Sequence, residues 1–323
     1  MIKDYTYFGN ERLAPYVEAR LKDAGWSRSS DDAQIHAAIT YFTSLSALED
    51  AYFADGGIIG SLDKGSLIID LSPATPSLAR EIAAMCSVND LHFIEAPLGF
   101  EDLASDDVFK GSEGAVCYVS GDKEDIDGAM PILEALSSNV ECVGGAGSAQ
   151  LAKSLATIQQ AAHILADIEC EALVSAVADS AADGKWGVVA ELNQNRRGDS
   201  SGTFGQGAGK EGVFTVEMHM AEVAAALAAA EDVDLVLPQL DSCMRLLEVL
   251  ALIGGVDMSP YAISLLYCDE DRGKLEGLDW KRAQDLYDGD EEWPISEEDD
   301  DYENWDDGLD EGPFGAYGRY SSN

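Results

Sequence analysis

The sequence is short of positive charge. Its 323 residues include 20 lysines and arginines against 61 aspartates and glutamates, a formal net charge of −41 at pH 7. The segment from Asp285 to Glu311 holds fifteen acids and no base, and the chain before it still has 46 acids against 19 bases. Because such a surface repels phosphate groups, the composition argues against binding to nucleic acid. It is typical of a highly solvated surface, and binding to a cationic partner is the alternative.

Long apolar runs, paired cysteines and clustered histidines are also missing. No apolar run approaches the ~18 residues that a membrane span requires, so we expect no membrane partner. The opening residues MIKDYTYFG carry an acid and aromatics, unlike a secretory signal. None of the six cysteines forms a C-x-x-C pair, and each of the four histidines stands alone. We therefore expect free thiols in a reducing, cytoplasmic environment, and no metal site.

The first part of the chain alternates apolar strands with amphipathic helices. This alternation predicts an α/β fold built on a doubly wound, Rossmann-like sheet. The predicted strands are Tyr5–Phe8, Ala37–Phe42, Gly65–Ser72, Leu91–Pro97, Gly114–Asp122 and Asn139–Gly144, and the predicted helices are Leu13–Leu21, Ser46–Phe53, Pro76–Cys86 and Lys123–Ser137.

Helices alone are predicted after Gly147, where no strand pattern is evident. They cover Ser148–Ala181, Val216–Ala230 and Leu240–Leu252, with a glycine-rich loop at Arg196–Gly212.

Three parts follow from these patterns. Beyond the helices, the acidic composition predicts disorder. We therefore predict a shortened Rossmann-like domain at residues 1–146, an all-α domain at residues 147–270 and a disordered acidic C-terminal tail at residues 271–323.

The start of the first helix departs from a dinucleotide fingerprint. A Gly-x-Gly-x-x-Gly or Ala motif would stand at Gly9 to Ala14, but Glu11 replaces the second glycine. Glutamate adds bulk and negative charge where a pyrophosphate would lie. Arg12 either compensates or is an exposed residue of the first helical turn. Only eleven residues separate Gly25 from the next strand, so the second strand–helix unit of a full Rossmann domain does not fit.

Four segments stand out by their order and spacing: GSLIIDLSPATP at Gly65–Pro76, FIEAPLG at Phe93–Gly99, GAVCYVSGDKEDIDGAMPILEAL at Gly114–Leu136 and VGGAGSAQLAKSLAT at Val143–Thr157. Together they resemble the β-hydroxyacid dehydrogenase superfamily. That family includes 3-hydroxyisobutyrate dehydrogenases, the NADP-binding domain of 6-phosphogluconate dehydrogenase, and imine reductases. The resemblance extends from Tyr5 to Tyr267.

The resemblance implies an oxidoreductase that uses NADP or NAD. It implies a small-molecule substrate, a small hydroxy acid, aldehyde acid or imine, and a homodimer formed through the helical domain. Lys153 would be the catalytic lysine, which gives a proton to the substrate oxygen or takes one from it. The other residues that the resemblance places at the site are Ser72, Gly99 and Thr157 on the substrate side, and Gly9, Arg12, Leu13, Phe42 and Thr43 on the cofactor side.

Several partners of Lys153 differ from the family pattern, which leaves three hypotheses open. Pro73 stands where the family has threonine, and Thr157 where it has asparagine. Gly99-Phe100-Glu101 replaces Ser-Gly-Gly, and Ala221-Glu222 replaces a Lys-Asp pair. The chain is then either an oxidoreductase with an impaired cofactor site, or an inactive homologue that binds a ligand or partner. The third hypothesis is an acidic interaction protein that acts through its tail.

Overall fold

The computed structural model describes residues 4–29, 37–100, 103, 114–180 and 214–289. The predicted loop at Arg196–Gly212 lies outside these residues, as does most of the acidic tail. By its contacts the chain divides into a compact unit from Met1 to Ala283 and a second unit from Gln284 to Asn323. The site lies in the first unit.

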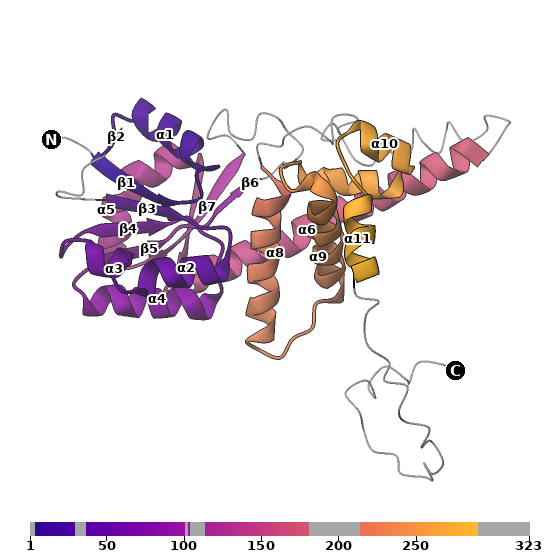
Figure 1. Ribbon diagram of the computed structural model, residues 1–323. Helices are drawn as coiled ribbons and strands as arrows, with labels where there is room; N and C mark the ends of the chain where they lie inside the picture. Colours follow the sequence, from indigo (N-terminus) through magenta and orange to yellow (C-terminus); the bar gives the residue numbers. More distant parts are fainter. Residues whose placement is uncertain (1–3, 30–36, 101–102, 104–113, 181–213, 290–323) are drawn as a thin grey trace, which may run out of the picture. The chain divides into compact units, whose positions relative to one another are not determined.

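An eight-stranded sheet forms the N-terminal part (Figure 1), with the order β2-β1-β3-β4-β5-β7-β6 and with β8 beside β7. β2 to β5 run parallel to β1, while β7 pairs antiparallel with β5 and β6 and parallel with β8. The predicted α/β fold is confirmed, and the six predicted strands are present. The strands are β1 (Asp4–Gly9), β2 (Ser27–Arg28), β3 (Ala37–Tyr41), β4 (Leu67–Asp70), β5 (His92–Glu95), β6 (Leu98–Phe100), β7 (Ala115–Gly121) and β8 (Asn139–Gly144).

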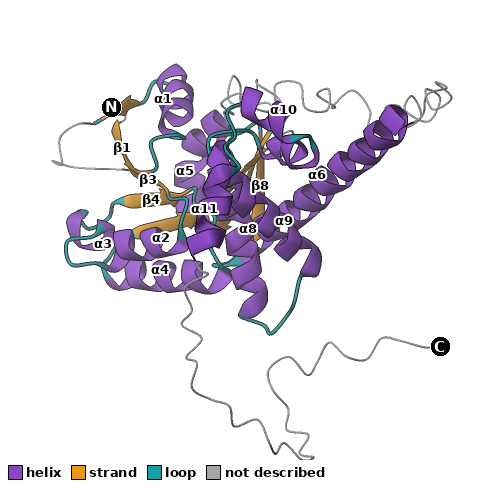
Figure 2. Cartoon of the chain, turned by 45° about the vertical axis from the view of Figure 1, so that its right-hand side comes forward, coloured by secondary structure: helices purple, strands orange, loops and turns teal. Residues whose placement is uncertain are grey.

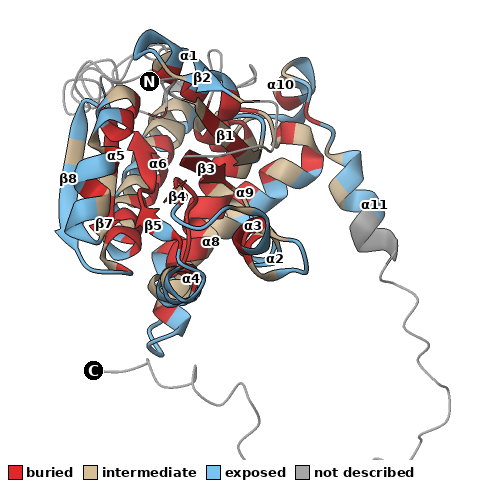
Figure 3. Ribbon diagram, turned by 90° about the vertical axis from the view of Figure 1, so that its left-hand side faces the viewer, coloured by how far each residue is buried: buried red, intermediate tan, exposed pale blue. Residues whose placement is uncertain are grey.

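Helices cover both faces of this sheet, which explains why its central strands are mostly apolar and buried. Every residue of β3 is buried, and side chains that alternate along it enter two different apolar clusters. One cluster includes residues of α1 and α5, and the other includes residues of α2, α3 and α4. Figure 3 shows the buried strands between helices whose outer surfaces are exposed. The helices are α1 (Ala14–Asp23), α2 (Leu45–Phe53), α3 (Ile58–Ser61), α4 (Pro76–Val88) and α5 (Lys123–Leu136).

The second strand of the sheet is only two residues long. Ser27 and Arg28 pair in parallel with Asp4 and Tyr5 directly after α1 ends. Residues 30–36, which precede β3, are outside the described part of the chain. The short spacing noted in the sequence therefore leaves a two-residue β2 beside β1.

Helices alone follow β8 within the described residues. α6 contacts β7 and β8 and also packs against α8 and α9 (Figures 1 and 2), so it joins the sheet to the helical part. Two helices and the buried Leu278 lie in the first residues of the segment predicted as a tail. No helix in the described ranges is both long and apolar enough to cross a membrane. The elements are α6 (Ser148–Ser180), α8 (Val216–Glu231), α9 (Pro238–Leu250), a π-helical segment (Ala251–Gly255), a 3-10 helix (Pro260–Tyr267), α10 (Glu270–Leu275) and α11 (Lys281–Gly289).

Candidate functional site

A buried ion pair joins helix α6 to helix α8. Lys153 lies in the second turn of α6, and its Nζ is 2.6 Å from Oε1 of Glu222 on α8. The two side chains are only 5% and 3% exposed. Gly99 of β6 lies beside the same ammonium group, since a Cβ atom at Gly99 would be 3.5 Å from Nζ. Three elements, β6, α6 and α8, therefore meet at Lys153.

The charge on Glu222 depends on this pair. Burial alone would raise the pKa of Glu222, but the positive charge of Lys153 and the nearby His219 outweigh burial and hold that pKa below its ordinary value. His219 Nδ1 lies 3.6 Å from Glu222 Oε2, one helical turn away on the same helix. At neutral pH Glu222 is therefore a carboxylate in contact with Lys153 Nζ, and both side chains are shielded from water.

Polar atoms without a hydrogen-bond partner surround the ion pair. Among the described residues, the buried atoms Thr157 Oγ1, Glu222 Oε2 and both ring nitrogens of His219 have none. Phe214 covers this cluster: its ring packs edge-on against His219 and against Phe100 of β6. Most buried polar atoms in proteins have a hydrogen-bond partner, so these four atoms beside the ion pair are exceptions.

Two side chains fix the start of α6, and with it Lys153. The Gly147 N–H donates to Glu95 Oε1 at the end of β5, and burial raises the pKa of Glu95. Gln150 donates to the Ser72 carbonyl at 2.9 Å and accepts from the Ala74 N–H at 2.9 Å. The first turn of α6 is thus held against the turns that follow β4 and β5.

Ser72 lies in the predicted region, but both hydrogen-bonding functions of its hydroxyl are used inside the protein. The hydroxyl donates to Asp70 Oδ1 at 2.6 Å and accepts from the Phe42 N–H at 3.0 Å, and the residue is fully buried. Asp70 Oδ1 also accepts from the Thr40 hydroxyl at 2.8 Å. Burial raises the pKa of Asp70 to about 6, although these hydrogen bonds oppose the shift. The hydroxyl of Ser72 therefore joins the ends of β3 and β4.

Gly9 and Leu13 have structural roles that the motif does not reveal. Gly9 has a φ of +118°, and a Cβ atom there would overlap with the Tyr41 carbonyl of β3. Glycine is needed for this close approach of two strands. Leu13 is fully buried in the core under α1.

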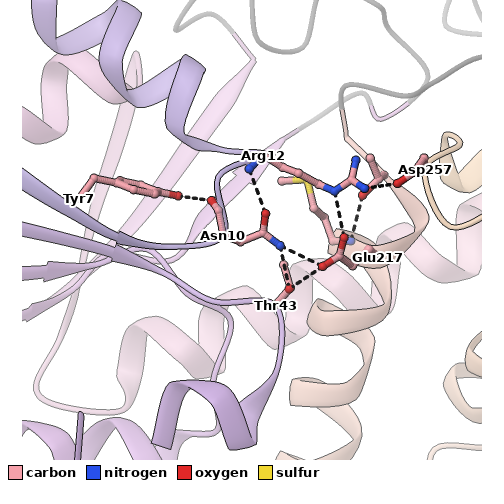
Figure 4. A network of polar contacts seen from close by, with 8 residues as sticks. Tyr7, Asn10, Arg12, Thr43, Glu217 and Asp257 are labelled. Carbon is pink, nitrogen blue, oxygen red and sulfur yellow. Dashed lines mark hydrogen bonds and ion pairs between the residues drawn. The ribbon is translucent and has the colours of Figure 1, made fainter. Parts of the chain in front are cut away.

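A network of polar contacts closes the loop between β1 and α1 (Figure 4). Asn10 Nδ2 donates to Thr43 Oγ1 at 3.0 Å and to Glu217 Oε1 at 2.9 Å. The Thr43 hydroxyl donates to the same Glu217 oxygen at 2.9 Å. Arg12 Nε donates to Glu217 Oε2 at 3.0 Å, and Arg12 Nη2 pairs with Asp257. Glu217, from the first turn of α8, thus lies between the ends of β1 and β3.

The two polar sites flank the end of β3. Burial, together with the nearby carboxylates of Glu222 and Glu217, raises the pKa of Tyr41 well above its ordinary value. Of the predicted site residues, Gly99 lies beside Lys153, Thr157 follows Lys153 by one helical turn, and Arg12 and Thr43 both contact Glu217. No role was predicted for His219 or Glu217. The only local signal for His219 was its place three residues before Glu222 on one helix face.

The loop, as it is arranged, does not fit a dinucleotide diphosphate. In a Rossmann domain the pyrophosphate lies at the start of the first helix. Here the Asn10 N–H donates to the Tyr41 carbonyl at 2.7 Å, and the Arg12 N–H donates to Asn10 Oδ1 at 2.9 Å. Arg12 and Thr43 donate to Glu217, while Glu11 adds a carboxylate that pairs with Arg28 at 3.1 Å.

No group of three or more histidine, cysteine or acidic side chains is placed to hold a metal ion, as far as the chain is described.

Comparisons with known proteins agree with this architecture. Residues 11–144 match the NAD binding domain of 6-phosphogluconate dehydrogenase. The chain is 30% identical over 154 residues to the uncharacterised oxidoreductase YkwC of Bacillus subtilis. This match covers 47% of this chain and 51% of that protein. It is 31% identical over 144 residues to the mitochondrial 3-hydroxyisobutyrate dehydrogenase of Mus musculus, with 43% and 41% covered. The matches thus span about half the length of these relatives or less.

The fold resembles a solved dehydrogenase over more of the chain. 3-Hydroxyisobutyrate dehydrogenase of Mycobacterium tuberculosis, solved with L-serine, superposes with a TM-score of 0.59 at 16% identity. The match covers 83% of this chain and all of that one. The predicted resemblance to NAD(P)-dependent β-hydroxyacid dehydrogenases is confirmed.

Proposed function

We propose that this protein is an NAD(P)-dependent oxidoreductase of the β-hydroxyacid dehydrogenase type, with Lys153 as its proton donor and acceptor. The substrate would be a small hydroxy acid, aldehyde acid or imine. The observation that carries the proposal is the buried Lys153–Glu222 pair beside Gly99. A buried lysine with one acidic partner suits proton exchange with a substrate oxygen or nitrogen.

The geometry supports a role for each residue of the pair. In the reducing direction, the ammonium of Lys153 would stabilise negative charge that develops on a carbonyl oxygen and give it a proton. In the oxidising direction, the amine would take that proton back. Glu222 compensates the charge of Lys153 in a site that excludes water. The hydride comes from NAD(P) or goes to it in proteins of this type.

A substrate screen with purified protein and NADPH or NADH tests the proposal. Turnover should fall by roughly 10²- to 10⁴-fold in Lys153→Ala, the usual loss when a general acid–base group is removed. Lys64→Ala is a matched control, because Lys64 is exposed and pairs only with Asp90 among the contacts described. Unchanged turnover in Lys153→Ala would contradict the proposal. A folded protein that turns over no substrate would favour an inactive homologue with a binding role.

A homodimer through the helical part belongs to the same proposal. Exposed apolar side chains along α6, at Leu151, Leu155 and Leu173, support it. Light scattering on eluted protein should give twice the mass of the 34.5 kDa chain. A cytoplasmic location is proposed as well, and the six free cysteines are consistent with it.

A further inference from the structure

Glu217 binds to the loop before α1 as an anion would. Both of its carboxylate oxygens are used: Oε1 accepts from Asn10 and Thr43, and Oε2 accepts from Arg12. Hydrogen bonds from a guanidinium to a carboxylate are among the strongest that side chains make. These side-chain donors near the loop could bind an external anion, but here they donate to a carboxylate of the protein itself (Figure 4).

The start of α8 holds Glu217 firmly in this position. The Thr215 side chain caps the helix by accepting from the Met218 N–H. The N–H groups of Val216 and Glu217 donate to the carbonyls of Met258 and Val256 at 2.8 and 3.2 Å. An acidic residue in the first turn also interacts favourably with the helix dipole. Glu217 is thus presented to the loop by backbone that is itself fixed.

Charge around the loop adds to the effect of Glu217. Among the described residues, the carboxylates of Glu11, Glu217 and Asp257 pair with two guanidinium groups, those of Arg12 and Arg28. A dinucleotide would bring two further negative charges on its diphosphate. A phosphate bound by the same donors would lie next to the Glu217 carboxylate, and two negative charges in such close proximity repel each other.

We propose that Glu217 determines the affinity of this protein for the dinucleotide: its carboxylate occupies the anion-binding place of the loop and must leave before a diphosphate can bind there. The inference rests on the proposed function, because it concerns the cofactor of that reaction. It assigns to α8, on the helical part, control over a site that the sheet provides.

Calorimetric titration of the wild type and Glu217→Gln with two probes, NADPH and inorganic pyrophosphate, tests this at one fixed ionic strength. Glutamine keeps the size of the side chain and removes its charge. We expect Glu217→Gln to bind NADPH at least about tenfold more tightly than the wild type, because a charged competitor is gone and Arg12 keeps only Asp257 as a carboxylate partner among the contacts described. Pyrophosphate binding should strengthen in the same direction.

Glu231→Gln is the matched control. Glu231 is exposed at the other end of α8, so the same charge is removed from the same helix away from the loop. Its affinity for either probe should differ from the wild type by less than about twofold, since screening weakens charges at that range. Circular dichroism confirms folding of each variant.

The outcomes separate this inference from the proposed function. Equal NADPH affinity in the wild type and Glu217→Gln would overturn the inference and leave the function intact. Pyrophosphate binding gained by Glu217→Gln, with no NADPH binding in either protein, would support the inference and remove the cofactor from the proposed function. If folded Glu217→Gln bound neither probe, both would be overturned.

Discussion

Lys153 Nζ lies 2.6 Å from Glu222 Oε1, and almost no solvent reaches either side chain. Loss of one partner leaves the other charge buried and unpaired. We therefore expect Glu222→Ala to lower the free energy of unfolding by about 3–5 kcal/mol, the usual cost of breaking a buried ion pair. Urea denaturation at pH 7 measures this change.

The double variant Lys153→Met with Glu222→Leu is the control for that prediction. It replaces both charges with apolar groups, which is often close to neutral for stability. The double variant should therefore be more stable than Glu222→Ala alone. Equal destabilisation in the two proteins would mean that lost packing, and not an uncompensated charge, is what Glu222→Ala reports.

Ser72→Ala should affect stability more than catalysis. The Ser72 hydroxyl is fully buried and joins Asp70 to the Phe42 N–H, so its removal leaves buried groups with fewer partners. We expect a loss of about 1–3 kcal/mol in the free energy of unfolding. Ser46→Ala, on the exposed start of α2, is the control. A raised KM with unchanged stability would instead place this hydroxyl at the substrate.

Local pattern in the sequence was sufficient to predict six of the eight strands and seven of the helices in the described residues. β3 and β4 are mostly apolar because helices cover both faces of the sheet, and apolar runs of that length predict buried strands. β2 and β6 were not predicted, because these strands are only two and three residues long and so short a segment shows no clear periodicity.

The closed loop could not be predicted in the same way. Asn10 and Glu217 are 207 positions apart in the chain, and their contact depends on how α8 packs against the sheet. No local motif encodes that packing. Lys153 was singled out only because neighbouring segments resembled a known family, and the structure buries it between β6, α6 and α8. Its partner Glu222 was noted merely as a departure from the family pattern.

Asp70 should make stability depend on pH in the acid range. Its pKa is raised from 3.8 to about 6 in the folded protein, chiefly by burial, so the folded state holds a proton that the unfolded state has already released. This contribution to stability is complete below pH 4 and is lost as the pH rises towards 6. At neutral pH the charged form costs up to about 3 kcal/mol, at roughly 1.4 kcal/mol per unit of pKa.

Asp70→Asn isolates that contribution. Asparagine keeps an acceptor for Ser72 and Thr40 but does not titrate. The difference in unfolding free energy between the variant and the wild type should therefore shift in favour of the variant from pH 4 to 6 and stay constant above. Denaturation at several pH values measures it, with Asp55→Asn on an exposed turn as the control. A difference that does not change between pH 4 and 7 would contradict the prediction.

Gly9 should be needed for the fold whether or not the loop binds a nucleotide. Its φ of +118° disfavours any other residue, and an added Cβ would overlap with the Tyr41 carbonyl of the neighbouring strand. We expect Gly9→Ala to destabilise the protein by on the order of 3 kcal/mol, because strain and overlap act together. Gly128→Ala is the matched control: this glycine is exposed on α5 with open space around its Cβ position, and alanine there should stabilise by about 0.5–1 kcal/mol. Thermal denaturation of both variants would distinguish a structural glycine from one kept only for a phosphate. If Gly9→Ala were as stable as the wild type but bound NADPH less tightly, the prediction would be contradicted, and Gly9 would be required for ligand binding and not for folding.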